Sequence, residues 1–313
     1  MRPFFFSSLI AIGTTTVAQS GRSTGTELWV TYMENLNLAF NGPPSFELVV
    51  SSDANTSGEV QVPYSGFTIP FTVMAGHDTV ITLPNNIYYP EGDEDVFNSG
   101  LRVVAEAPVS VYAYHHRSYF SEASMALPIE GLGIDHLVIA HTDVSGNSPS
   151  ELVVMATEDA TTIEITPSAL TVGFRPPGLP FTVMLNTGQV FQLQAFGDLT
   201  GTRVRSVDGQ KRLAVFAGAR QAWVGCGMGA DDHLYQAIPP LSEWGQRFIV
   251  VPFKDRGGDP FRLFSATDGN QVIVGGLPAI MLDSGQYVDQ VLTQPTLVQA
   301  SDPLAVAQFN ESQ

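Results

Sequence analysis

One pattern of short β-strands occurs three times along the chain, about 110 residues apart, and it restricts the fold more than any other feature. The three copies open with ELWVTYMENL, DHLVIAHTDV and QRFIVVPFKD. Each opener is followed by paired alternating segments, such as FELVVSSDANTSGEVQV in the first copy and FRLFSATDGNQVIVGG in the third. A period of this length is too long for one turn of a solenoid and is typical of tandem small domains.

Apolar and polar residues alternate within these segments, which predicts half-buried strands. In TTIEITP, for example, we expect Ile163 and Ile165 to face a core while Thr162 and Glu164 face outward. Asp with Asn, Thr or Gly separates the two strands of each pair, which is typical of β-hairpin turns. Each copy also closes with a predicted strand pair, and sustained helical periodicity is absent. The sequence therefore predicts an all-β protein.

The recurrence predicts three tandem, related β-sandwich-like modules, because each copy has the strand content of an immunoglobulin-sized sandwich. One closed β assembly with threefold pseudo-symmetry, such as a propeller-like ring, is the alternative. The predicted boundaries are a signal peptide at 1–20, module one at 26–116, a connector at 117–133, module two at 134–220, a connector at 221–245 and module three at 246–313.

The two predicted connectors correspond to each other. SEASMALPIEGLGIDHLVI joins copies one and two, and ADDHLYQAIPPLSEWGQRFIV joins copies two and three. We interpret the matching residues as structural. The predicted junction residues are Glu122, Pro128, Gly133, Asp232, Pro240, Trp244 and Gly245.

The N-terminus has the pattern of a secretory signal peptide: Arg2, an apolar stretch at 4–13, and small residues up to Ala18. No later stretch reaches the roughly 18 apolar residues that a membrane helix needs. We therefore expect a secreted or cell-surface protein without a transmembrane segment. Cys226 is the single cysteine, so the chain contains no intrachain disulfide.

The net charge of −17 argues against nucleic acid as a partner, because so acidic a chain cannot neutralise a run of phosphates. The same charge permits weak binding of Ca²⁺ by carboxylate oxygens. The acidic segment YYPEGDEDVFNSG and the segment GADDHLYQ supply the candidates, although a solvated acidic loop is the simpler interpretation. The candidate calcium ligands are Glu91, Asp93, Asp95, Asp231 and Asp232.

A zinc or catalytic site would need His115, His116, His136, His141 and Glu122 to converge. His115 and His116 are adjacent on an expected strand, so their side chains point to opposite faces. The chain has no H-E-x-x-H and no C-x-x-C motif, and no G-x-S-x-G lies on a strand–turn–helix. We therefore predict that the protein is not an enzyme and needs no cofactor beyond possible structural calcium.

Aromatic residues supply the candidates for ligand contact, because tyrosine in loops offers a large contact area for proteins or glycans. Some of them flank the acidic segment and others lie in the first connector. The candidate binding residues are Tyr88, Tyr89, Tyr119 and Phe120.

Five segments, in order, resemble the amino-terminal domain family of the IgG Fc-binding protein: GTELWVTYMENL, SELVVMATEDATTIEITPSA, LNTGQVFQLQAFGDLTGTRVRS, LAVFAG and DDHLYQAIPPLSEWGQRFIVVPF. The resemblance covers approximately residues 26 to 309. Many members place several cysteines near the segment matching GCGMGADDHLYQAIPP, and the disulfides implied there cannot form with Cys226 alone.

The resemblance implies a secreted, bacterial-type interaction module and supplies no catalytic residues. We therefore expect non-enzymatic binding or adhesion to an extracellular protein or glycan. The alternative function is that of a secreted glycan-active or metal-dependent hydrolase, which would gather histidines and carboxylates from different copies into one cleft.

Overall fold

The computed structural model describes residues 23–36, 42–84, 90–118, 120–143, 146–225, 231–255 and 257–311. Within these residues the chain forms 23 strands and two short 3-10 helices, η1 (Ile129–Gly131) and η2 (Leu241–Glu243). The predicted all-β fold is confirmed. Neither helix is long and apolar enough to cross a membrane. The predicted signal peptide and Cys226 lie outside the described residues.

The first set of strands forms two layers. It comprises β1 (Gly25–Val30), β2 (Ser45–Ser51), β3 (Thr56–Val62), β4 (Phe67–Val73), β5 (Asp78–Thr82), β6 (Val96–Phe97), β7 (Leu101–Arg117), β8 (Phe120–Met125) and β9 (Leu127–Pro128). One layer has the order β4–β3–β7–β1–β9, and the other has the order β5–β2–β7–β8. The long strand β7 belongs to both, because its first half pairs with β1 and β3 and its second half pairs with β2 and β8.

Two further sets repeat this pairing. The second comprises β10 (Asp135–Leu137), β11 (Ser150–Ala156), β12 (Thr161–Thr166), β13 (Phe181–Leu185), β14 (Val190–Ala195), β15 (Arg203–Ser206), β16 (Leu213–Ala222) and β17 (Asp232–Ala237). Its layers are β13–β12–β15–β10 and β14–β11–β16–β17, and β6 of the first set extends the latter beside β14.

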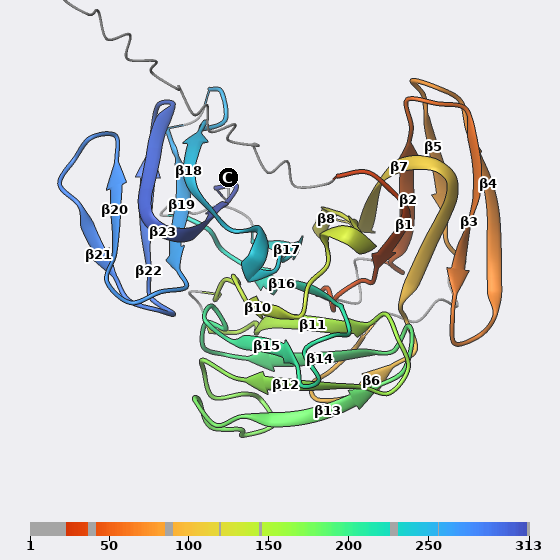
Figure 1. Ribbon diagram of the computed structural model, residues 1–313, viewed down its shortest axis with the longest axis horizontal. Coiled ribbons are helices and arrows are strands. Elements are labelled where there is room, and N and C mark those ends of the chain that lie inside the picture. Colours follow the sequence, from red (N-terminus) through yellow and green to blue (C-terminus); the bar gives the residue numbers. More distant parts are fainter. Residues whose placement is uncertain are drawn as a thin grey trace, which may run out of the picture.

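The third set comprises β18 (Gly245–Val250), β19 (Asp259–Ser265), β20 (Asn270–Val274), β21 (Ile280–Leu282), β22 (Tyr287–Leu292) and β23 (Thr296–Gln308). Its layers are β21–β20–β23–β18 and β22–β19–β23. As with β7, one strand serves both layers. The three sets follow one another around a bend, with the second set between the other two (Figure 1).

The strand pairs predicted as hairpins are not hairpins. β2 pairs with β5 and β7, whereas β3 pairs with β4 and β7, and β11/β12 and β19/β20 behave in the same way. Each tight connection carries the chain from one layer to the opposite layer. The turn residues allow a sharp change of direction in either case, so composition alone does not distinguish a hairpin from a crossing between layers.

The predicted closing strand pairs also differ from expectation in two sets. β7 and β23 each run uninterrupted from one layer into the other, past Pro108 and Pro303. Neither proline is paired in a ladder, which fits the missing N–H of proline at the crossing. In the second set the corresponding strand is divided into β15 and β16.

Both predicted connectors contain regular structure. Residues 117–133 include β8, β9 and η1, and residues 221–245 include β17 and η2. β8 and β17 extend the second layer of their own sets. Because the predicted connectors contribute strands to these layers, the structure draws no line between connector and module, and the predicted domain boundaries stay a prediction. Among the described residues, no strand of the third set pairs with a strand of another set.

The alternation predicted for β12 is confirmed: Ile163 and Ile165 are buried, and Thr162 and Glu164 are partly exposed. β11 is buried at every position instead. Leu152 and Val154 point into the core of the second set, while Val153 and Met155 belong to the core of the first. The layer containing β11 is therefore covered on both faces.

Two matched glycines at the junctions differ in the space around them. A Cβ on Gly133 would lie 2.2 Å from Cβ of Pro240, whereas a Cβ on Gly245 would lie 3.3 Å from the nearest ring atom of Phe248. We predict that Gly133→Ala lowers the free energy of unfolding by about 1–3 kcal/mol, because overpacking a rigid proline forces a shift of the backbone. Gly245→Ala should cost clearly less, since the Phe248 ring can move. Urea unfolding of both variants tests this, and equal losses would contradict it.

Candidate functional site

The adjacent histidines lie on opposite faces of β7, as the alternation predicts. His115 is fully buried, and its ring centroid lies 4.6 Å from that of Phe46 and 5.4 Å from that of His233. Burial, followed by the proximity of His233, lowers the pKa of His115 well below its usual value. His116 is exposed, and its Nδ1 lies 2.8 Å from Oγ of Ser121. His115 is therefore part of an aromatic contact between the first two strand sets.

The other two candidate histidines also pack within the structure. Nδ1 of buried His136 lies 3.2 Å from the carbonyl oxygen of Ile238, and burial lowers the pKa of His136 to about 4. The ring of His141 lies 5.0 Å from that of Phe309. No group of three or more His, Cys, Asp or Glu residues in the described part of the chain is placed to hold a metal ion.

The acidic segment before β6 docks against the second strand set. Asp93 accepts hydrogen bonds from the backbone N–H groups of Gly173 (2.7 Å) and Gln194 (2.6 Å). Glu94 forms an ion pair with Arg175 at 2.7 Å. Burial raises the pKa of Asp93. These two carboxylates therefore join strand sets, which a solvated acidic loop would not do.

The five candidate calcium ligands differ in exposure and in hydrogen-bond partners. Glu91 and Asp95 are exposed. In the second pair, Asp231 accepts a hydrogen bond from Nε2 of Gln221, and Asp232 accepts one from the backbone N–H of His233 at 2.9 Å. Burial raises the pKa of Asp232.

Of the candidate binding aromatics, Tyr88, Tyr89 and Tyr119 lie outside the described residues. Phe120 is 9% exposed, and its carbonyl oxygen accepts a hydrogen bond from Nδ2 of Asn35 at 3.0 Å. Phe120 therefore packs within the first strand set at the start of β8.

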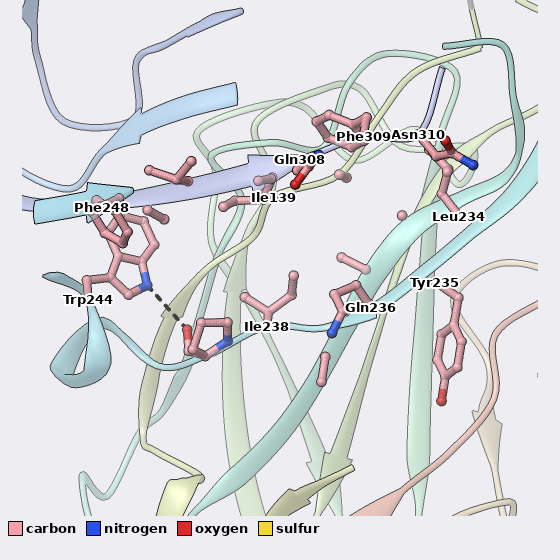
Figure 2. Close-up of a pocket in the computed structure, with 18 of the residues that line it drawn as sticks. Ile139, Leu234, Tyr235, Gln236, Ile238, Trp244, Phe248, Gln308, Phe309 and Asn310 are labelled. Carbon is pink, nitrogen blue, oxygen red and sulfur yellow. Dashed lines mark hydrogen bonds between the residues drawn. The ribbon is translucent and has the colours of Figure 1, made fainter. Parts of the chain in front are cut away.

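A cavity of about 400 Å³ lies between β16 and β17 of the second set and β18 and β23 of the third. We call it the junction pocket, and Figure 2 shows its lining. Its larger side chains are mostly apolar or aromatic. They include Ile139, Leu234, Tyr235, Ile238, Trp244, Phe248, Phe253 and Phe309.

Trp244, a predicted junction residue, forms one wall of the junction pocket. Its Nε1 donates a hydrogen bond to the carbonyl oxygen of Pro239 at 3.3 Å, which Figure 2 marks with a dashed line. Its ring packs against Phe264, with 5.4 Å between centroids. Trp244 therefore joins the second connector to β19 and is held in one orientation.

Glu122, another predicted junction residue, brings a carboxyl group from β8 to the junction pocket. Burial raises the pKa of Glu122 to about 7. The negative charge of Asp232 also raises this pKa, whereas a hydrogen bond from the backbone N–H of Ala123 lowers it. The sequence placed Glu122 and Asp232 at corresponding positions in the two connectors. The structure brings them close enough to interact.

Arg262 on β19 holds the two walls of the junction pocket together. Its guanidinium group is almost fully buried and forms ion pairs with Asp198 at 2.8 Å and Asp289 at 2.9 Å. It also donates to the carbonyl oxygen of Ala140 and to Oγ1 of Thr200, both at 2.8 Å. Asp198, Ala140 and Thr200 belong to the second set, so this side chain fixes the third set against it.

Sequence reasoning missed Arg262 and the pocket-lining phenylalanines. The available signal for Arg262 was a lone cation inside the apolar strand PFRLFS, where burial requires an anionic partner. Its partner Asp198 is 64 residues away. The pairing therefore becomes visible only with the relative placement of the strand sets.

We predict that Glu122→Gln stabilises the protein at high pH and not at low pH. The unfolded chain releases this proton near pH 4.5 and the folded chain near pH 7, so the group's contribution to stability falls as pH rises through that window. At pH 8 the variant should gain about 1–3 kcal/mol over the parent, and at pH 4 nothing. Urea unfolding from pH 4 to 9 measures the difference, with the exposed Asp95→Asn as control. A difference that does not change with pH would contradict the assignment.

No solved structure matches the chain. The human IgGFc-binding protein is 23% identical over 236 residues, which cover 73% of this chain. The chain spans only 4% of the length of that relative. The family model described as IgGFc binding protein matches residues 122–313, a range that includes every residue lining the junction pocket. The chain therefore belongs to the IgGFc-binding protein family.

Proposed function

We propose that the protein is a secreted, non-enzymatic binding module that holds a protein ligand at the junction pocket. The observation that carries this proposal is the pocket itself. It has the volume of a small ligand site, its walls are mostly apolar and aromatic, and it lies wholly within the segment matched by the family model.

The chemistry of the junction pocket favours an apolar or aromatic side chain of a protein over a sugar. Sugar sites need several polar groups converging on hydroxyls. The walls here are formed mostly by side chains such as Ile238, Leu234 and Phe248, and the polar exceptions are Gln236, Glu243, Gln308 and Asn310. Glu122 adds a carboxyl group to the lining, where it can accept or donate a hydrogen bond near neutral pH. A side chain presented by a rigid partner surface would fill such a pocket as an anchor.

The arrangement of histidines and carboxylates gives the hydrolase alternative less support. His115 and His136 are buried among apolar groups, and Asp93 and Glu94 hold the first two strand sets together. The predicted signal peptide supports an extracellular location. The name of the human relative states that it binds IgG Fc, which makes Fc the first protein probe for this chain.

We predict that filling the junction pocket weakens ligand binding. Ala307 lines the pocket, so Ala307→Phe would occupy it, whereas Ala75→Phe places the same ring on an exposed turn in the first strand set. Surface plasmon resonance against IgG Fc, serum proteins and a glycan panel identifies the ligand. Ala307→Phe should then weaken binding at least about tenfold, which is about 1.4 kcal/mol, and Ala75→Phe should not.

The result that would overturn the proposal is unchanged affinity of a correctly folded Ala307→Phe variant. A protein that binds no probe but hydrolyses a glycan would instead support the hydrolase alternative.

A further inference from the structure

The stretch that follows β1 is covered by the second strand set. The carbonyl oxygen of Thr31 accepts a hydrogen bond from the hydroxyl of Tyr235. The ring of Tyr32 lies 6.2 Å from that of Tyr235, and Glu34 forms an ion pair with Arg220 at 3.1 Å. The outer face of β14–β11–β16–β17 therefore docks on residues 31–34.

The stretch that follows β10 is covered by the third strand set in the same way. The carbonyl oxygen of Ala140 accepts a hydrogen bond from Arg262, and the ring of His141 contacts Phe309. Leu137 and Ile139 pack with Phe264 and Ala305 in one apolar cluster. The outer face of β22–β19–β23 therefore docks on residues 137–141.

Strand register identifies the corresponding stretch of the third set. Trp29 lies opposite Arg102, Leu137 opposite Arg203, and Ile249 opposite Leu297. Trp29 and Leu137 are 2% and 7% exposed, whereas Ile249 is 76% exposed. Two and four residues further on, Val251 and Phe253 are 55% and 53% exposed, whereas Thr31 and Met33 are fully buried.

The apolar surface continues across the layer β21–β20–β23–β18. Leu297 is 39% exposed beside Ile249, and Ile273 and Met281 continue the surface on β20 and β21. The corresponding layers of the other two sets carry ion pairs at this place: Glu27 with Arg102 at 2.7 Å in the first set, and Asp135 with Arg203 at 2.6 Å in the second. An exposed apolar surface in place of ion pairs indicates an interaction site, even though Gln299 lies opposite Ile273 and Gln271 opposite Met281.

The first strand set has the opposite feature, a docking face with nothing on it. Val49 on β2 lies opposite Tyr112, at the place where Val153 lies opposite Phe216 in the second set. Phe216 is buried against the first set, but Tyr112 is 46% exposed, and Val80, which lies opposite Val49 on the other side of β2, is 57% exposed. The outer face of β5–β2–β7–β8 is thus uncovered in the described residues.

The two uncovered surfaces are complementary in charge. Exposed Arg247 flanks the apolar stretch of the third set at one end, and at the other end exposed Lys254 forms an ion pair with Asp255 at 3.5 Å. Glu47 and Asp78 lie on the outer face of β5–β2–β7–β8, beside Val49 and Val80. Opposite charges at the rims of two apolar patches favour one mutual orientation.

We propose that residues 249–253 of one molecule receive the outer face of the β5–β2–β7–β8 layer of a second copy. This contact between two molecules would have the same geometry as the contact that joins each strand set to the next within one chain. It is head to tail, because it uses two different surfaces of the same protein. This assembly goes beyond the ligand binding proposed above and does not depend on it, but Phe253, the last residue of the receiving stretch, also lines the junction pocket.

Sedimentation velocity on the full chain over a range of concentrations tests the proposal. The parent should self-associate as concentration rises. Ile249→Asp removes one surface and Tyr112→Asp the other, so each variant alone should be monomeric. Ile249 is 76% exposed and Tyr112 46% exposed, so neither change should unfold the protein, which circular dichroism checks. Met184→Asp, at a 65% exposed site on β13, is the matched control and should associate like the parent.

Mixing the two variants gives the sharpest result. The Tyr112→Asp variant still has the surface at residues 249–253, and the Ile249→Asp variant still has the outer face of β5–β2–β7–β8. The mixture should therefore form a one-to-one dimer and nothing larger. A parent that stays monomeric up to roughly 1 mM would overturn the proposal, because a contact that weak has no use as an assembly. So would a Tyr112→Asp variant that still dimerises, since the contact would then join two identical surfaces.

Discussion

The structure depends on a layer of strands that is buried on both faces. β11, β14 and most of β16 lie between the core of the second strand set and that of the first. A continuous apolar run such as LVVMA is what a strand covered on both sides requires. Burying apolar area contributes about 25 cal/mol per Å² removed from water. The second buried face of this layer therefore stabilises the contact between the two sets, which a linker alone would not do.

Polar side chains buried beside this layer determine how the sets meet. Gln194 donates to both Glu34 (3.0 Å) and Glu151 (2.9 Å), and Arg220 forms an ion pair with Glu34. Burial, followed by the charge of Glu34, raises the pKa of Glu151 well above its usual value. An unmatched polar group in such a place is costly, so the network disfavours other orientations of the two sets. Arg262 has the same role at the next junction, which in turn shapes the junction pocket.

The sequence predicted what depends on local alternation and composition. Ile163 and Ile165 face the core, and His115 and His116 point to opposite faces of β7. The structural role predicted for the matching connector residues stays a prediction, although Gly133 of the first connector does lie against Pro240 of the second. The predictions that failed depend on three-dimensional placement. The turn after β2 has the composition of a hairpin, yet it crosses to the other layer. His233 contacts His115 although 118 positions separate them in the chain, and no periodicity reports such a contact. For the same reason the junction pocket, built from two strand sets, could not be predicted.

The continuity of β7 has a mechanical consequence. One 17-residue strand is hydrogen-bonded in both layers of the first set, so neither layer can detach without breaking the ladder of the other. Tension applied along the strand loads many backbone hydrogen bonds in shear at once, instead of opening them one at a time. β23 gives the third set the same property, while the second set, with its strand divided into β15 and β16, lacks it.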